Sequence, residues 1–282
     1  MMKKGLISVL TIALLGLLAT SVSFAQETPS VDEILDNLDA EGDLLLGDGI
    51  IARLHTFNEY DDGTDSETVT AALQAPDKSL MYILEPWDAE GQVYLMVVEP
   101  DELGEQKTRV WYYSAYIYSE PKEMVSEEER RSGFGGSAMS FESMGDEDMR
   151  DDYDIVILRE ESLSIEGVNR TAYVLEATAR PETDDEFART LMWVDKEAFV
   201  VLKMEGYNEV GEKTLTMDVA ELNEFEGLVT ADVMIVDNRR LGTRSTYTIS
   251  DRRRPEGGFP EDLFTPEGVV QFDPADWGFP TE

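Results

Sequence analysis

The feature of this sequence that most restricts its fold is a strict alternation of apolar and polar residues. The alternation recurs from Ile50 onward in short segments, whereas an amphipathic helix would repeat about every 3.6 residues. Turn residues separate many of these segments, as in Asp61-Asp62-Gly63 and Glu226-Gly227. The predicted strands are residues 50–60, 67–75, 79–86, 92–99, 108–114, 115–118, 155–161, 170–179, 190–194, 199–207, 213–221, 228–236 and 244–250.

Many short strands joined by tight turns, with few helices between them, indicate a mainly β protein. Such a chain is expected to form an antiparallel meander that curves into an open sheet or a barrel. No internal repeat and no Pro/Ser-rich linker divides the chain after its first 25 residues. We therefore expect residues 26–282 to form a single domain.

One helix is predicted before the strands. Ser30 and Glu33 have the spacing of a capping box, in which each side chain binds the backbone of the other residue. The apolar residues after the cap share one face of a helix, and they are Val31, Ile34, Leu35 and Leu38. A helix this short gains little stability alone, so its stripe must dock, either as ordinary core packing or as a plug in a barrel mouth.

A long segment of different composition, residues 120–154, interrupts the strands. It is rich in charge, glycine and methionine, and it contains Gly133-Phe134-Gly135-Gly136-Ser137 followed by Phe141. A loop of this length within a domain is usually functional or disordered. We interpret it as a flap with a short helix near residues 141–148, and the alternative is a disordered insertion.

The first 25 residues have the features of an export signal. Lys3 and Lys4 precede an apolar run over residues 6–18, and Ser23-Phe24-Ala25 is a cleavage site of the small-x-small type. Cleavage is expected after Ala25. The sequence has no cysteine, so neither a lipid-modified cysteine nor a disulfide can form.

The charge balance argues against several functions. The chain has 60 acidic residues against 23 Lys and Arg, which gives a formal net charge of −37. Such a surface repels nucleic acid, so we expect no nucleic-acid partner. Because the acidic residues are spread along the chain, the charge indicates a solvated coat, and docking to a basic partner is the alternative.

Residue combinations that support catalysis or metal binding are missing from the sequence. The single histidine, His55, lies in an alternating segment with no cysteine to complete a zinc site or a nucleophile–histidine pair. The acidic run at residues 61–65 lacks the pattern of an EF-hand, and Gly133-Phe134-Gly135-Gly136 lacks the Lys-Ser/Thr of a phosphate loop. We therefore expect a binding protein rather than an enzyme, with no cofactor and no metal.

Several segments together resemble the LolA-like family, particularly its branch of outer-membrane lipoprotein-sorting proteins. The resemblance is carried, in order along the chain, by residues 84–95 (LEPWDAEGQVYL), 109–113 (RVWYY), 135–142 (GGSAMSFE), 191–196 (LMWVDK) and 261–265 (EDLFT). It implies a strongly curved antiparallel sheet or half-open β-barrel, with the N-terminal helix and the flap covering its mouth.

The resemblance also implies a function. A protein of this family is expected to act as a periplasmic carrier that holds the acyl chains of a lipoprotein or lipid for transport toward the outer membrane. An inner-membrane exporter of the resistance-nodulation-division (RND) type would be its partner, and the carrier would be a monomer. The alternatives are a sensor module of the same shape that detects mislocalised lipoproteins and, from another class, a hydrolase acting on lipids.

The expected acyl cavity needs apolar side chains on the inner face of the strands. Residues 199–204 and 215–219 alternate in this way, and the chain's 12 methionines suit a pliable lining. The candidate cavity residues are Leu35, Leu95, Trp111, Phe134, Phe141, Met192, Val194, Val200, Leu202, Met204, Met217 and Tyr247.

Overall fold

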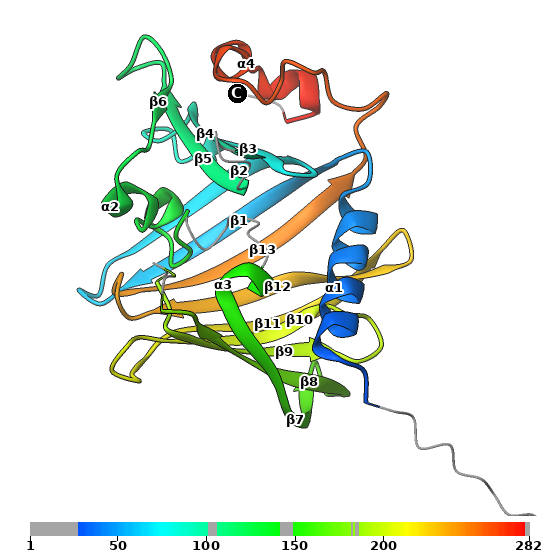
Figure 1. Ribbon diagram of the computed structural model, residues 1–282. Coiled ribbons are helices and arrows are strands. Elements are labelled where there is room, and N and C mark those ends of the chain that lie inside the picture. Colours follow the sequence, from blue (N-terminus) through cyan, green and yellow to red (C-terminus); the bar gives the residue numbers. More distant parts are fainter. Residues whose placement is uncertain (1–27, 101–105, 142–148, 182, 184–185, 280–282) are drawn as a thin grey trace, which may run out of the picture.

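The computed structural model describes residues 28–100, 106–141, 149–181, 183 and 186–279 (Figure 1). Its strands form one antiparallel sheet of 13 strands. They are β1 (Ile50–Tyr60), β2 (Asp65–Ala75), β3 (Lys78–Glu85), β4 (Gln92–Pro100), β5 (Gln106–Ser114), β6 (Lys122–Glu123), β7 (Tyr153–Ile165), β8 (Val168–Ala179), β9 (Arg189–Asp195), β10 (Val201–Tyr207), β11 (Lys213–Phe225), β12 (Leu228–Asn238) and β13 (Thr243–Arg253).

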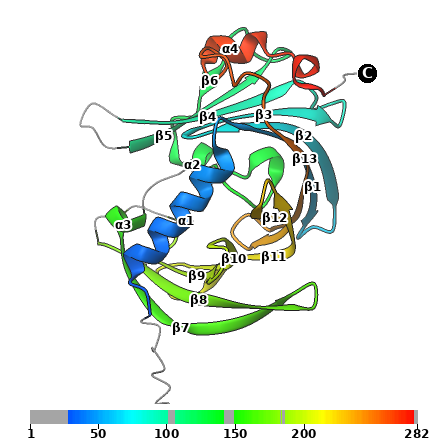
Figure 2. The ribbon, with the colours of Figure 1, turned by 90° about the vertical axis from the view of Figure 1, so that its right-hand side faces the viewer.

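The sheet consists of two meanders joined at their ends. Its order is β6-β5-β4-β3-β2-β1-β13-β12-β11-β10-β9-β8-β7, so β1 pairs with both β2 and the last strand, β13. The sheet curves strongly, and β6 and β7 remain as separate edges (Figure 2). The predicted half-open antiparallel sheet is therefore confirmed.

One predicted strand, residues 115–118, is wrong. The chain turns directly after β5, because the N–H groups of Ile117 and Tyr118 both donate to the carbonyl oxygen of Ser114, at 2.9 Å. The next residues to pair with β5 belong to the two-residue strand β6, which the sequence did not predict. Tyr116 and Ile117 in this turn are exposed, so the alternation of residues 115–118 does not reflect a buried strand face.

The N-terminal helix α1 (Val31–Leu46) begins as predicted and continues beyond the predicted stripe. The capping box is confirmed, since the N–H of Glu33 donates to Ser30 Oγ (3.2 Å) and the N–H of Ser30 donates to Glu33 Oε2 (2.7 Å). At the other end, the guanidinium of Arg254 donates to the carbonyl oxygens of Leu45 (2.7 Å) and Leu46 (2.8 Å). This contact supplies the C-terminal cation that a helix with no basic residue in its last turn lacks.

Helix α1 crosses the concave side of the sheet (Figure 2). Its buried Ile34 and Leu35 pack on β8 and β9, against Leu175 and Met192. A second arginine, Arg150 of the short helix α3 (Met149–Asp152), binds α1 from outside through Asp36 (2.8 Å) and Asp39 (3.0 Å). The apolar packing and the two ion pairs together hold α1 over the half of the sheet formed by β7–β10.

The convex face of the other half is covered by the C-terminal segment. This segment contains α4 (Pro266–Gln271) and the 3-10 helix η3 (Pro274–Trp277), and it lies outside β3 and β4 (Figure 2). Its Phe264 and Phe279 belong to one buried cluster with Leu95 and Trp111 of the sheet. The β7–β10 half is therefore covered on its concave side by α1, and the β1–β5 half is covered on its convex side by the C-terminal segment.

Two predicted segments lie outside the described residues. The export signal, residues 1–25, is one of them, and most of the helix expected near residues 141–148 is the other. Within the described part of the chain, no helix has the length and apolar character needed to span a membrane.

Candidate ligand-binding site

The predicted flap is a segment seated on the concave face of the sheet. We call residues 132–141 the plug; it contains the 3-10 helix η1 (Phe134–Gly136), and it follows helix α2 (Glu127–Arg130). Phe134 and Phe141 are buried against Tyr94 of β4, with ring centroids 4.8 Å and 5.3 Å from that of Tyr94. The two phenylalanines thus anchor the plug to the β3–β5 half of the sheet.

Buried polar side chains hold the centre of the plug. The N–H of Ala138 donates to Ser245 Oγ (2.8 Å), and the N–H of Met139 donates to Tyr247 Oη (3.0 Å). Asn238 Nδ2 donates to the carbonyl oxygen of Ala138 (3.0 Å). We call Asn238, Ser245 and Tyr247 the latch; all three are buried, and they come from β12 and β13.

Glycine is required where the plug turns sharply. A Cβ added at Gly133 would lie 1.9 Å from the carbonyl oxygen of Ser137, a distance no side chain could accept. Gly136 has φ +81°, and a Cβ there would lie 2.9 Å from Tyr60 Oη. The glycines that suggested bending in the sequence therefore permit a compact turn that fits close to β1.

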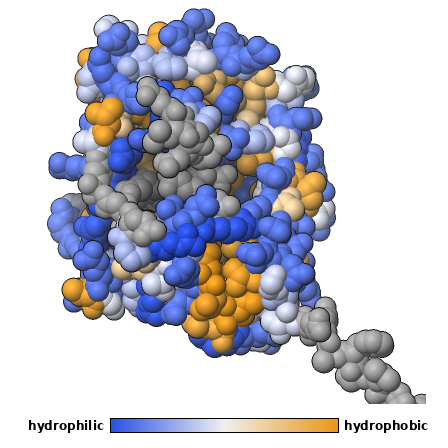
Figure 3. All heavy atoms as spheres, in the orientation of Figure 1, coloured by the Kyte–Doolittle hydropathy of each residue, from blue (hydrophilic) through white to orange (hydrophobic). Residues whose placement is uncertain are grey.

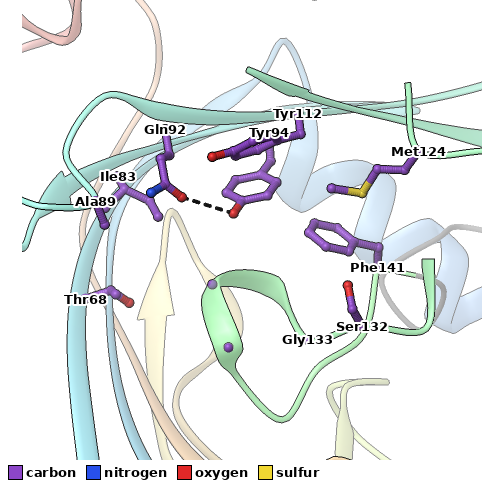
Figure 4. A pocket seen from close by; sticks show the side chains of 12 residues that line it. Thr68, Ile83, Ala89, Gln92, Tyr94, Tyr112, Met124, Ser132, Gly133 and Phe141 are labelled. Carbon is purple, nitrogen blue, oxygen red and sulfur yellow. Dashed lines mark hydrogen bonds between the residues drawn. The ribbon is translucent and has the colours of Figure 1, made fainter. Parts of the chain in front are cut away.

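Beside the plug is a hollow of about 420 Å³ (Figure 4). Its walls are the strands β2–β5 and the plug itself, and Tyr94, Met124 and Phe141 project toward one another around it. Burial, and then the neighbouring Tyr112, raise the pKa of the Tyr94 phenol, which therefore stays neutral. The lining is Thr68, Ile83, Ala89, Gln92, Tyr94, Tyr112, Met124, Ser132, Gly133, Gly135, Gly136 and Phe141.

The candidate cavity residues fall into two groups. Eight of them lie in concave-face clusters. Leu35 of α1 packs with Met192 and Val194 of the sheet; Phe134 and Phe141 belong to the aromatic cluster; and Met204, Met217 and Tyr247 cluster with Phe187 around Ala138 of the plug.

The remaining four candidates do not line this face. Leu95 and Trp111 lie on the convex face beneath the C-terminal segment, and Val200 and Leu202 pack with Trp193 in a separate cluster. Successive side chains of a strand point to opposite faces, so Tyr94 rather than Leu95 faces the plug. The sequence analysis assigned Leu95 and Trp111 to the opposite face of β4 and β5. In β10, a register shift between Val201 and Lys203 interrupts the alternation, so Leu202 and Met204 belong to different clusters.

The latch is the part of the site that the sequence analysis missed. Asn238 and Ser245 were not candidates, and Tyr247 was chosen as apolar lining rather than for its hydroxyl. Polar residues in alternating strands normally face water, and nothing local distinguishes these from the exposed ones. The contact also joins residues about 100 positions apart, Ala138 and Asn238.

Surface colouring shows that apolar side chains are also gathered at the lower part of the view in Figure 3, below a polar band. Exposed apolar residues of the edge strand β7 include Val156 and Leu158.

Within the described part of the chain, no group of three or more His, Asp and Glu side chains is arranged to hold a metal ion.

Comparison with known proteins gives one family and several structures. A family model described as an uncharacterized protein matches residues 75–269. No curated protein matches the sequence.

The similar structures share the fold at low sequence identity. A DUF1329 family protein from Desulfovibrio piger is 19% identical, with a TM-score of 0.71, over 86% of this chain and 100% of its own. An outer membrane lipoprotein-sorting protein domain from Vibrio parahaemolyticus is 20% identical, with a TM-score of 0.69, over 84% and 97%. A LolA superfamily protein from Nitrosomonas europaea is 19% identical, with a TM-score of 0.63, over 85% and 99%.

Proposed function

Since the chain belongs to the family whose model spans residues 75–269 and has the fold of LolA superfamily proteins, we propose that it is a carrier that binds acyl chains on the concave face of its sheet. Its cargo would be a lipoprotein or another lipid. The observation that carries this proposal is the hollow beside the plug, where Ile83, Met124 and Phe141 provide apolar walls. Its volume of about 420 Å³ is within the range of ligand pockets, roughly 300–1,000 Å³.

Binding would enlarge the hollow by moving the plug. Phe134 and Phe141 fill the space next to Tyr94 in the present structure, and an acyl chain entering there would replace their contacts. Each buried CH₂ group contributes about 0.8 kcal/mol, so a long acyl chain can offset the loss of two aromatic anchors. The carrier would need no cofactor and no catalytic group.

We propose the periplasm as the place of this function. The apolar run and cleavage site within residues 1–25 would direct export, and cleavage after Ala25 would release the carrier domain. A passive carrier needs an upstream donor that supplies cargo, for which an RND-type inner-membrane exporter is our candidate. The monomer is the state in which the concave face would receive cargo from such a donor.

A charged side chain in the hollow should prevent binding. Met124 lines the hollow, whereas the next residue, Val125, is 72% exposed. We expect Met124→Lys to weaken binding of a palmitoyl ester carrying a nitrobenzoxadiazole fluorophore by at least about tenfold, because an ammonium group in an apolar pocket must stay solvated. The same change at Val125 should alter the Kd by less than about twofold. Equal effects of the two substitutions in a fluorescence titration would contradict the proposed location.

A further inference from the structure

The concave face beneath the centre of the plug is polar. Asn58, Asn238 and Ser245 are at most 1% exposed, and Ser245 Oγ also donates to Asn58 Oδ1 (2.6 Å). Next to them, Thr56 pairs across the strands with Tyr247, and its hydroxyl has no hydrogen-bond partner among the described residues. Hydrocarbon alone cannot replace the plug here, because it would leave these buried polar groups unsatisfied.

The latch binds one complete peptide group of the plug. The carbonyl oxygen of Ala138 accepts from Asn238, and the N–H of Met139, from the same peptide group, donates to Tyr247. The preceding N–H, that of Ala138, donates to Ser245. The three latch side chains thus match two amide donors and one amide acceptor of the bend at Ala138 and Met139.

From this geometry we infer that the latch is a recognition subsite for the amide groups of an acylated peptide, and that the plug occupies it as an internal mimic of the cargo. The inference rests on the proposed carrier function and names its cargo class as a lipopeptide. When cargo binds, its amide groups would take the place of those at Ala138 and Met139. The latch side chains would bind the same types of group in the cargo as they bind in the plug, namely amide N–H groups and a carbonyl oxygen.

The surroundings of the latch suit the rest of such a ligand. Met204, Met217 and Met234 of the sheet are partly buried beside it, and methionine adapts readily to an apolar chain of varied shape. The latch itself has no charged member, so a free carboxylate placed there would be buried without a cation. An amide-linked acyl chain therefore fits this site better than a fatty acid does.

The test is a competition experiment with the fluorescent palmitoyl ester as the probe. N-palmitoyl-glycyl-glycine amide and methyl palmitate compete separately, and the ratio of their inhibition constants measures amide recognition. We expect the native protein to prefer the amide by about tenfold or more, as for a few well-formed buried hydrogen bonds. We expect Tyr247→Phe and, as a second variant, Ser245→Ala to reduce this preference by at least about threefold each.

The control is Tyr116→Phe, which removes a phenol hydroxyl that belongs neither to the hollow nor to the latch, since Tyr116 is 88% exposed. Its preference ratio should equal that of the native protein. Equal binding of amide and ester by the native protein would overturn the amide subsite while leaving the carrier function intact. So would latch variants with an unchanged ratio. Failure of both ligands to compete, together with failure of the probe to bind, would instead reject the carrier function itself.

Discussion

A disulfide between the plug and the sheet is expected to abolish acyl binding. Ala138 and Ser245 are in direct contact through a hydrogen bond of 2.8 Å, and both residues are fully buried. The native chain has no cysteine, so Ala138→Cys with Ser245→Cys creates a single pair that can join. If ligand entry requires the plug to leave, the oxidised protein should bind the fluorescent palmitoyl ester at least about tenfold more weakly than the reduced protein.

The comparison of one protein in two redox states removes the effect of the substitutions themselves. Loss of the Ser245 hydroxyl weakens the latch equally in both states, and each single cysteine variant provides a further control. The measurement is a fluorescence titration before and after reduction, with the disulfide verified by mass. If the oxidised and reduced proteins bind the ester equally well, the plug is not the entrance.

The second large effect is expected at the aromatic anchor of the plug. Phe141 is 2% exposed and Phe279 is 1% exposed. Replacing a core phenylalanine with alanine lowers the free energy of unfolding by about 3–5 kcal/mol. Phe279 belongs to the C-terminal cover on the convex face, and Phe279→Ala should show this full loss with unchanged acyl affinity. Phe141→Ala should cost less global stability, because the plug can detach locally while the sheet stays folded.

The same substitution should strengthen binding. The fraction of molecules with a free concave face limits the apparent affinity, and Phe141→Ala would raise that fraction. We expect the affinity for the palmitoyl ester to increase by about tenfold, measured by titration, while urea unfolding gives the stability of both variants. Equal losses of stability for the two variants, with no gain in affinity for Phe141→Ala, would show that the plug is a fixed part of the core.

Local patterns predicted the strands and the first helix well. Alternation and turn residues are properties of neighbouring positions, and the capping box at Ser30 and Glu33 is complete within four residues. Local patterns do not determine equally well which face of the sheet each side chain occupies, because a shift of one residue exchanges the two faces. Leu95 and Trp111 are as apolar as a cavity lining requires, yet the C-terminal segment covers them on the convex side.

The attachment of the plug could be predicted only in part from local sequence patterns. Its length and glycines indicated a segment apart from the sheet, and Phe134 and Phe141, two of the candidate cavity residues, are buried in the cluster around Tyr94. Its polar attachment depends on strands that follow it by about 100 residues, and it places polar side chains at the centre of a face expected to be apolar. Only the folded sheet brings these groups together.

The most direct test of the carrier account is the native mass of the protein, purified without detergent from a periplasmic extract, since the periplasm is the compartment that we propose for its function. The account predicts a bound acyl species at close to one per chain, released by organic extraction and identified by its fragments. It also predicts that the oxidised Ala138→Cys, Ser245→Cys protein, exposed to the same lipid extract, stays at the mass of the chain alone. A native protein that carries no lipid and takes up none from the extract would contradict the account.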